Sequence, residues 1–315
     1  MKAYKSAAAA ITVLAVALTA TACGGDSESA GDGPTRQAKA EDLPKLPTYK
    51  VATDVDIDSP TLEKAQKAGK LVIGAKNDQP FLGFEDEKGN RSGFDIEIAK
   101  MIAADLGFSA DKIEFKTVDT GVREAAISNG EVDLYVGTYT INEERKKKVA
   151  FAGPYYMAGA DLLIREDDRT IAGPFSLEGK TVCSAKGSTA LREIKKPEYN
   201  TRTVETAKYT ECVQQLLEGK VDAVTTDDAI LKGYAAQHAG KLKVVGQPFT
   251  EEPYGIGMAK DDEALRDAVS DALQAHDENG DYKLAYDATL GLSGSHYVGA
   301  ADGPARLTAH RVRAV

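Results

Sequence analysis

The chain has 315 residues, a formal net charge of −10 and an apolar fraction of 42%. The acidic balance argues against nucleic acid as a partner, because nucleic-acid binding needs a basic surface. Four histidines and the lack of a Cys-x-x-Cys pair argue against a metal site, and we expect no cofactor. The length suits one large or two modest domains.

The N-terminus is typical of an exported protein. Lys2 and Lys5 precede an uncharged, mostly apolar run over residues 7–22. This run is shorter than the roughly 20 residues that a bilayer span needs, and its length suits the core of a signal peptide. Residues 1–22 are therefore predicted to be a signal peptide.

Cys23 directly follows this leader. The small residues at 20–22 resemble the lipobox of bacterial lipoproteins, in which the cysteine is lipidated, although Ala20 stands where that motif prefers Leu. A secretory signal that happens to contain a cysteine is the alternative. We expect Cys23 to be lipidated and to anchor the protein at the outer face of the cell membrane.

Residues 23–57 are predicted to be a flexible tether. They are rich in Gly, Asp, Ser, Glu, Ala, Lys and Pro, and they hold few large apolar side chains. Such a segment buries too little surface to offset the entropy lost on ordering it. A connection between a lipid anchor and a folded domain is its natural use.

A first unit of alternating strands and helices follows. The helical spacing of apolar residues that begins at Asp95 stops at Gly107. Alternation of short apolar runs with helical patterns predicts a mostly parallel sheet covered by helices. The predicted strands are 71–74, 113–115 and 132–136, and the predicted helices are 95–106 and 122–129.

The pattern then restarts in a second α/β unit. Extended segments at 159–165 and 254–258 stand on either side of it and resemble paired crossings between two lobes. Residues 261–290 are helical again and are expected to return to the first lobe. The predicted strands of the second unit are 180–183, 221–224 and 242–245, and its predicted helices are 189–196, 209–218 and 229–238.

The chain is therefore expected to form two lobes, the first of them discontinuous. Lobe 1 comprises residues 58–158 and 254–292, and lobe 2 comprises residues 159–253. Residues 293–315 are rich in Gly, Ala, Arg and His without periodicity, and we expect a loose tail.

Cys183 and Cys212 remain once Cys23 is assigned to lipid. Two cysteines in an exported protein favour a disulfide, because the exterior is oxidising. The closed loop would stabilise the fold by about 3 to 4 kcal/mol on the chain-entropy model. Two buried free thiols are the alternative.

Several segments resemble the family 3 extracellular solute-binding proteins. Residues 93–106 fit the signature of that family at every constrained position, and the resemblance covers residues 60–290. Weaker local matches occur in the family's order and spacing. They are residues 129–133, 143–145, 151–156, 187–189 and 254–257.

Within the family, the chain most resembles the glutamate-binding lipoproteins of bacterial ABC importers, including their paired cysteines. The resemblance implies an α/β fold, a two-lobed periplasmic-binding-protein-like clamp of type II. Each lobe is then a mixed sheet covered by helices, with two hinge crossings between the lobes. It also implies a monomer that closes on an amino acid and delivers it to the transmembrane subunits of an ABC permease.

Candidate ligand contacts fall just after strands, where ligands sit in open α/β sheets. Gly137, Thr138, Thr140 and Arg145 follow the third predicted strand. In the family, the matching Arg forks onto the ligand's α-carboxylate with two parallel N–H donors, and the matching small residues and backbone bind its ammonium and carboxylate. A surface arginine beside the basic run 146–148 is the alternative.

The second unit supplies further candidates. Ser188 and Thr189 follow Gly187 at a predicted helix start, where free N–H groups bind anions, although an ordinary helix cap is the alternative. Asp227 matches the family's acid that pairs with the ligand's ammonium, whereas Asp228 is expected to cap the next helix.

Three residues of the first unit are expected to contact the rest of the ligand. Phe81 matches an aromatic that packs over the ligand, and a core phenylalanine is the alternative. Lys76 and Arg123 align with basic positions that hold the distal carboxylate in members that bind acidic amino acids, whereas Arg91 is expected to be solvated. Glutamate is therefore the expected ligand and aspartate the alternative, because glutamine would leave a desolvated cation partly unpaired.

Two other functional classes are weighed against a transport receptor. Some relatives of this fold are exported cyclohexadienyl or arogenate dehydratases, but the sequence offers no nucleophile–base pair and no metal cluster. A ligand-presenting subunit of a sensor is the other alternative. We expect no enzymatic activity.

Overall fold

The structure is a computed structural model that describes residues 44–297. The predicted signal peptide, the lipidation site Cys23, the tether up to residue 43 and the tail beyond residue 297 lie outside the described residues. None of the helices within residues 44–297 has the length and apolar character needed to cross a bilayer.

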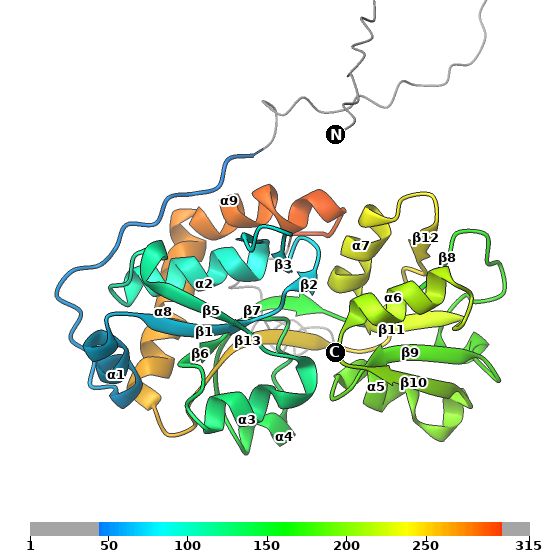
Figure 1. Cartoon of the computed structure of the whole chain (residues 1–315), viewed down its shortest axis with the longest axis horizontal. Coiled ribbons are helices and arrows are strands. Elements are labelled where there is room, and N and C mark those ends of the chain that lie inside the picture. Colours follow the sequence, from blue (N-terminus) through cyan, green and yellow to red (C-terminus); the bar gives the residue numbers. More distant parts are fainter. Residues whose placement is uncertain (1–43, 298–315) are drawn as a thin grey trace, which may run out of the picture. The chain divides into compact units, whose positions relative to one another are not determined.

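Lobe 1 is built on a five-stranded mixed sheet in the order β5-β1-β6-β13-β7. Strand β1 pairs in parallel with β5 and β6, and β13 runs antiparallel to β6 and β7. Figure 1 shows α2 and α9 on one side of this sheet and α3 on the other. The strands are β1 (Leu71–Ala75), β5 (Ile113–Thr117), β6 (Leu134–Tyr135), β7 (Ala150–Ala158) and β13 (Glu252–Met258).

The helices of lobe 1 come from both ends of the described chain. They are α1 (Pro60–Ala68), α2 (Phe94–Asp105), α3 (Arg123–Ser128), α4 (Glu143–Lys146), α8 (Glu263–Asn279) and α9 (Asp281–Ala288). A small antiparallel sheet of β2 (Asp78–Gln79), β3 (Gly83–Glu85) and β4 (Arg91–Ser92) precedes α2.

Lobe 2 holds a second five-stranded mixed sheet in the order β10-β9-β11-β8-β12. Its elements are β8 (Ala160–Arg165), β9 (Thr181–Ala185), α5 (Thr189–Ile194), β10 (Arg202–Thr206), α6 (Tyr209–Leu217), β11 (Ala223–Asp227), α7 (Asp228–Gln237) and β12 (Leu242–Val244). The predicted disulfide between Cys183 and Cys212 is confirmed and joins β9 to α6.

Short 3-10 turns occur in both lobes. They lie at Ala110–Lys112, Thr120–Val122, Pro174–Ser176, Pro197–Tyr199 and Leu290–Ser293.

The chain crosses between the two sheets twice. Strand β7 belongs to the first sheet and β8 to the second, so the first crossing falls at Gly159. The return runs through residues 245–251, between β12 and β13. These features confirm the predicted fold class, a two-lobed α/β clamp with mixed sheets and two crossings.

The signature segment forms the buried centre of lobe 1. Gly93 has a φ of 115°, and a Cβ atom there would lie 2.2 Å from the carbonyl oxygen of Leu82, so only glycine fits. The ring of Phe94 then packs at 5.2 to 6.3 Å against four tyrosines of β7 and α9. A fully buried aromatic of this kind contributes about 3 to 5 kcal/mol when compared with alanine. The four tyrosines are Tyr155, Tyr156, Tyr282 and Tyr286.

The described part of the predicted tether differs from a free linker. Val55 and Ile57 pack against the core of lobe 1, and the backbone N–H of Ala52 donates to the carbonyl of Ala104 at 2.8 Å. The hydroxyl of Tyr49 donates to Glu97 at 3.2 Å. Residues 49–57 therefore lie against lobe 1, because their few apolar side chains find a partner there.

Candidate functional site

A small polar cavity lies between the two lobes and contains about 230 Å³ of empty space. Both lobes contribute five residues to its lining, and all ten come from strand ends, helix starts or the turns between them. Seven of the lining residues are predicted ligand contacts. The lining consists of Thr120, Arg123, Thr138, Thr140, Arg145, Ser188, Thr189, Tyr209, Asp227 and Ile230.

Arg145 is the most firmly held cation of the cavity. Its Nη1 donates to the carbonyl of Thr140 at 2.7 Å, its Nη2 donates to the carbonyl of Gly187 in lobe 2 at 3.3 Å, and its Nε lies 3.3 Å from Glu124. Burial and the neighbouring Arg123 lower its pKa to about 10, so the side chain stays charged at neutral pH. The guanidinium is thereby fixed at the rim where the lobes meet.

Arg123 is only 2% exposed and forms no salt bridge among residues 44–297, although the charge of the neighbouring Glu124 acts on it. Its Nη1 donates to the carbonyl of Thr138 at 3.3 Å, and its Nε has no hydrogen-bond partner in the described part of the chain. The guanidinium stacks 4.4 Å from the ring centre of Tyr139, which also faces Arg145 at 5.0 Å. Stacking on an aromatic face favours a cation but leaves its hydrogen-bond donors free.

Lys76 lies behind the cavity wall rather than in it. Its Nζ donates to the hydroxyl of Thr120 at 2.8 Å and to the carbonyl of Val118 at 3.2 Å, and it forms no ion pair within residues 44–297. Burial, together with the charge of Arg123, lowers its pKa to about 7. An anion in the cavity would favour the charged form of this amine.

Asp95 of the signature segment holds one wall of the cavity in place. Its Oδ2 accepts the backbone N–H of Thr138 at 3.1 Å, and its Oδ1 accepts the hydroxyl of Tyr155 at 2.8 Å. Thr138 has a φ of 47°, which is unfavourable for a β-branched residue. The Thr138 hydroxyl donates to Gln79 at 3.1 Å, so two buried groups hold this strained residue at the cavity.

Asp227 ends β11 and lines the cavity from lobe 2. It accepts a hydrogen bond from the hydroxyl of Tyr254 at 2.7 Å, and burial together with the nearby Glu252 raises its pKa to about 8. Asp228 does not cap the following helix as predicted, because α7 begins at Asp228 itself. Its Oδ1 accepts the N–H of Gly159 at 3.2 Å.

Ser188 and Thr189 also line the cavity from lobe 2. The hydroxyl of Ser188 accepts the N–H of Leu191 at 3.1 Å, so it caps α5 while it also lines the cavity. Directly before them, a Cβ atom on Gly187 would lie 2.9 Å from the Cα of Gly121 in lobe 1. The two lobes therefore touch through glycines at this point.

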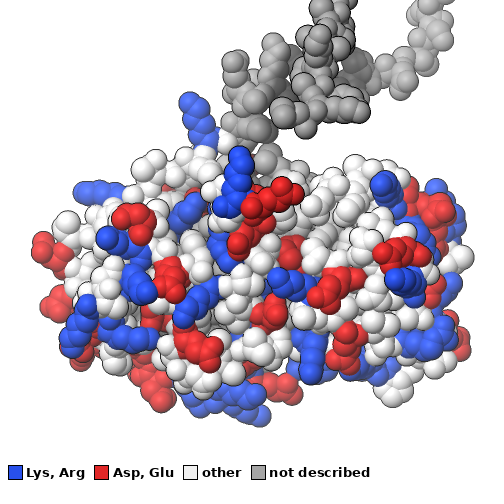
Figure 2. Space-filling view, viewed as in Figure 1, with Lys and Arg blue, Asp and Glu red and all other residues white. Residues whose placement is uncertain are grey.

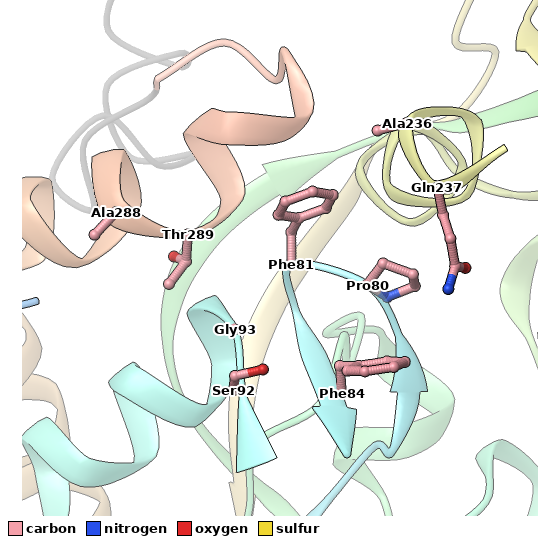
Figure 3. Close-up of a pocket in the computed structure, with 9 residues that line it drawn as sticks. All are labelled: Pro80, Phe81, Phe84, Ser92, Gly93, Ala236, Gln237, Ala288 and Thr289. Atoms are coloured by element: carbon pink, nitrogen blue, oxygen red, sulfur yellow. The ribbon is translucent and has the colours of Figure 1, made fainter. Parts of the chain in front are cut away.

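The structure does not bring Phe81 into this cavity. Phe81 has a φ of 65°, and it lines a different, mainly apolar pocket with Pro80, Phe84 and Ala236 (Figure 3). The positive φ places the backbone of Phe81 in the left-handed region, and its ring lies in this second pocket. Gly137 does not line the cavity either, since it lies against Lys76 and the ring of Tyr135.

Three cavity residues are missed by the sequence analysis. Thr120 follows the strand β5, so the strand-end argument could have found it. Tyr209 begins α6 and Ile230 lies in the first turn of α7, and no sequence pattern distinguishes them from core residues. Burial raises the pKa of Tyr209 to about 12, which keeps its hydroxyl neutral.

The charges on the surface give no comparable signal. On the face shown in Figure 2, Lys and Arg side chains are interspersed with Asp and Glu side chains. Within residues 44–297, no cluster of His, Cys, Asp and Glu side chains could hold a metal ion. The ionic character of the site thus comes from the buried residues of the cleft.

Two lobes, two crossings and a polar cavity between them define a clamp-type protein that binds a small ligand. The chain belongs to the bacterial extracellular solute-binding proteins, family 3, whose family model matches residues 71–291. The family resemblance expected from the sequence is thereby confirmed.

Individual relatives agree with this class. The chain is 36% identical to the glutamate-binding protein GluB of Corynebacterium efficiens over 295 residues, which is 90% of each chain. It is 41% identical to a glutamine-binding protein of Geobacillus stearothermophilus over 211 residues, 67% of this chain and 80% of that one. A solved structure of an ancestral arginine-binding protein bound to arginine has a TM-score of 0.65 and 35% identity, and the match covers 70% of this chain and 97% of that one.

Proposed function

We propose that the protein captures an acidic amino acid outside the cytoplasm and delivers it to an ABC permease. Glutamate is the proposed ligand and aspartate is the alternative. The observation that carries the proposal is the pair of buried basic side chains, Lys76 and Arg123, neither of which forms an ion pair among residues 44–297. A buried charge without a partner costs several kcal/mol, and a ligand carboxylate would remove that cost.

The remaining polar groups suit the zwitterionic end of an amino acid. Arg145 would fork onto the α-carboxylate, with Ser188 and Thr189 beside it, because a guanidinium presents two parallel donors to two oxygens. Asp227 would pair with the ammonium group. Thr138 and Thr140 line the same cavity and would complete the hydrogen bonds of the ligand backbone.

The names of the relatives support an amino acid as the ligand, and they leave glutamate and glutamine as the two candidates. GluB is named for glutamate, and the Geobacillus protein is named for glutamine. A glutamine amide brings no negative charge to Lys76 and Arg123. The charge count in the cleft therefore favours glutamate.

The proposed ligand is tested by measuring the glutamate-to-glutamine affinity ratio by calorimetry. Arg123→Ala and Lys76→Met should each weaken glutamate binding by at least about tenfold, because each removes a buried positive charge near the ligand's side-chain carboxylate. Glutamine binding should change much less, so the ratio should fall. Lys88→Met, which removes an exposed cation from the β3–β4 turn, is the control and should leave the ratio unchanged. Equal losses for both ligands would contradict the proposed side-chain recognition.

We also propose that the protein is a monomer tethered to the outer face of the cell membrane through lipid on Cys23. The motivation is the leader at 1–22 with small residues directly before that cysteine. Cys23→Ser should move the protein from the membrane fraction to the soluble extracellular fraction and abolish incorporation of a labelled fatty acid. A variant that stays with the membrane and still takes up label would refute the anchor.

A further inference from the structure

A second set of contacts joins the lobes outside the cavity. Residues 77–80 of lobe 1, which include β2, reach across to α6 and α7 of lobe 2. The Oδ2 atom of Asp78 accepts the backbone N–H groups of Tyr209 at 3.0 Å and of Thr210 at 3.4 Å. The hydroxyl of Tyr234, on α7, donates to the backbone carbonyl of Asp78. Asp78 is buried, and neither it nor Tyr234 lines the cavity.

The carboxylate of Asp78 supplies what α6 lacks. The first N–H groups of a helix have no partner within the helix, and Lys208 at the N-cap position offers no side-chain acceptor. A carboxylate at this end satisfies those donors and also interacts favourably with the helix dipole. Here the cap comes from the other lobe, so it can form only when the lobes are together.

Two neighbouring contacts show that the fit is close. The Nζ of Lys208 donates to the side-chain oxygen of Asn77 at 3.0 Å. A Cβ atom on Gly233 would lie 2.5 Å from the carbonyl oxygen of Pro80, so α7 approaches the lobe 1 backbone directly. The same junction is linked to the ligand cavity through Tyr209, whose side chain lines it.

We propose that Asp78 is a latch that caps α6 across the cleft and thereby determines ligand affinity without touching the ligand. The latch rests on the proposed function, since it acts by stabilising the closed clamp. Its contribution is the same for every ligand that allows closure. It therefore sets the strength of binding, while Lys76 and Arg123 set its selectivity.

The test compares Asp78→Ala, Tyr234→Phe and the control Glu87→Gln in a calorimetric screen of the twenty amino acids. Glu87 lies exposed in the β3–β4 turn of the same small sheet, so its variant removes an acidic charge without touching lobe 2. Asp78→Ala should raise the Kd of every bound amino acid by about 10- to 100-fold, and Tyr234→Phe by about 3- to 10-fold. The control should bind as the wild type does. In Asp78→Ala and Tyr234→Phe the thermal midpoint of the ligand-free protein should fall less than that of the glutamate-bound protein, and neither midpoint should change in the control.

Tyr234→Phe has a particular use, because burial lowers the pKa of Lys76 and the charge of Asp78 partly offsets that lowering, so Asp78→Ala would also change the charge state of Lys76. The tyrosine variant changes no charge, so its glutamate-to-glutamine ratio should equal that of the wild type. An altered ratio in this variant, unchanged Kd values in both variants, or an equal fall in the midpoints of ligand-free and bound protein would overturn the latch. A wild type that selects a different amino acid would overturn the proposed ligand and not the latch.

Discussion

Asp227 is a carboxyl group whose surroundings oppose its charge in the ligand-free protein. Its pKa of about 8, raised by burial and by Glu252, exceeds the usual value of 3.8. The folded state thus holds this proton more tightly than the unfolded chain does. This contribution to stability is fully present below about pH 4 and is lost as the pH rises through 8.

Asp227→Asn should therefore stabilise the ligand-free protein at pH 8 by about 1 to 2 kcal/mol, because an amide needs no ionisation and still accepts from Tyr254. The gain should vanish near pH 4. Amino-acid binding should be lost, since the amide cannot neutralise the ligand's ammonium. Urea denaturation at the two pH values and calorimetry measure both effects. A variant that is less stable at pH 8, or that binds as the wild type does, would contradict this account.

Residue positions after strands could be predicted from the sequence, whereas side-chain direction could not. The strand-end argument places Thr138, Arg145 and Asp227 at one edge, and the structure brings them into one cavity. Phe81 follows a strand as well. Its positive φ belongs to a non-glycine residue, so no sequence pattern indicated that its ring would line another pocket.

Among the elements, α8 is joined to α2 and α9 through one histidine. The Nε2 of His276 lies 2.9 Å from Asp105 at the end of α2, and its Nδ1 lies 3.0 Å from Asp281 at the start of α9. Burial alone would lower the pKa of His276, but the two carboxylates outweigh burial and raise it above the usual 6.5. The stabilisation is therefore fully present below about pH 6.5 and is lost as the pH rises through the raised value.

His276→Gln should cost about 1 kcal/mol of unfolding free energy at pH 6 and clearly less at pH 9. Chemical denaturation at both values measures the difference. The exposed His296 provides the matched control, and His296→Gln should leave the free energy of unfolding nearly unchanged. A loss of the same size at both pH values would mean that packing, and not charge, links the helices.

The elements that the sequence analysis missed have identifiable causes. Helix α1 carried a usable signal, because the hydroxyl of Ser59 caps it and Pro60 occupies its first position. Strand β7 contains Pro154, which argues against a central strand, but β7 lies at the edge of its sheet, where proline is tolerated. Strand β10 is also an edge strand, and its largely polar run from Arg202 to Thr206 gave no apolar pattern.

At the scale of the whole molecule, the two crossings allow the lobes to close around a ligand. Arg145 of lobe 1 and Asp227 of lobe 2 face the same cavity, so one amino acid can hold both. We expect a smaller radius of gyration by small-angle scattering with saturating glutamate than without it. Asp227→Asn should show no compaction at the same glutamate concentration. Superimposable wild-type curves with and without ligand would indicate a rigid pocket instead.

The discontinuous architecture was accessible to sequence analysis because each lobe repeats an α/β alternation and the two extended segments lie between them. The closed arrangement of the two lobes could not be predicted from the sequence. It depends on contacts such as Gly187 against Gly121 and Asp78 against α6, which join residues far apart in the chain. No local pattern encodes such pairs.

The Arg123 guanidinium, which stacks on Tyr139 and forms no salt bridge among residues 44–297, links ligand binding to the conformation of the lobes. A closed molecule without a ligand keeps the Arg123 guanidinium and the Lys76 amine buried without a counter-ion. The cost of these buried groups favours the open arrangement of the lobes when no ligand is bound. A bound ligand carboxylate would supply the missing counter-ion, so the closed conformation would report that a ligand is bound. A permease that recognises only the closed conformation would then rarely engage the ligand-free protein.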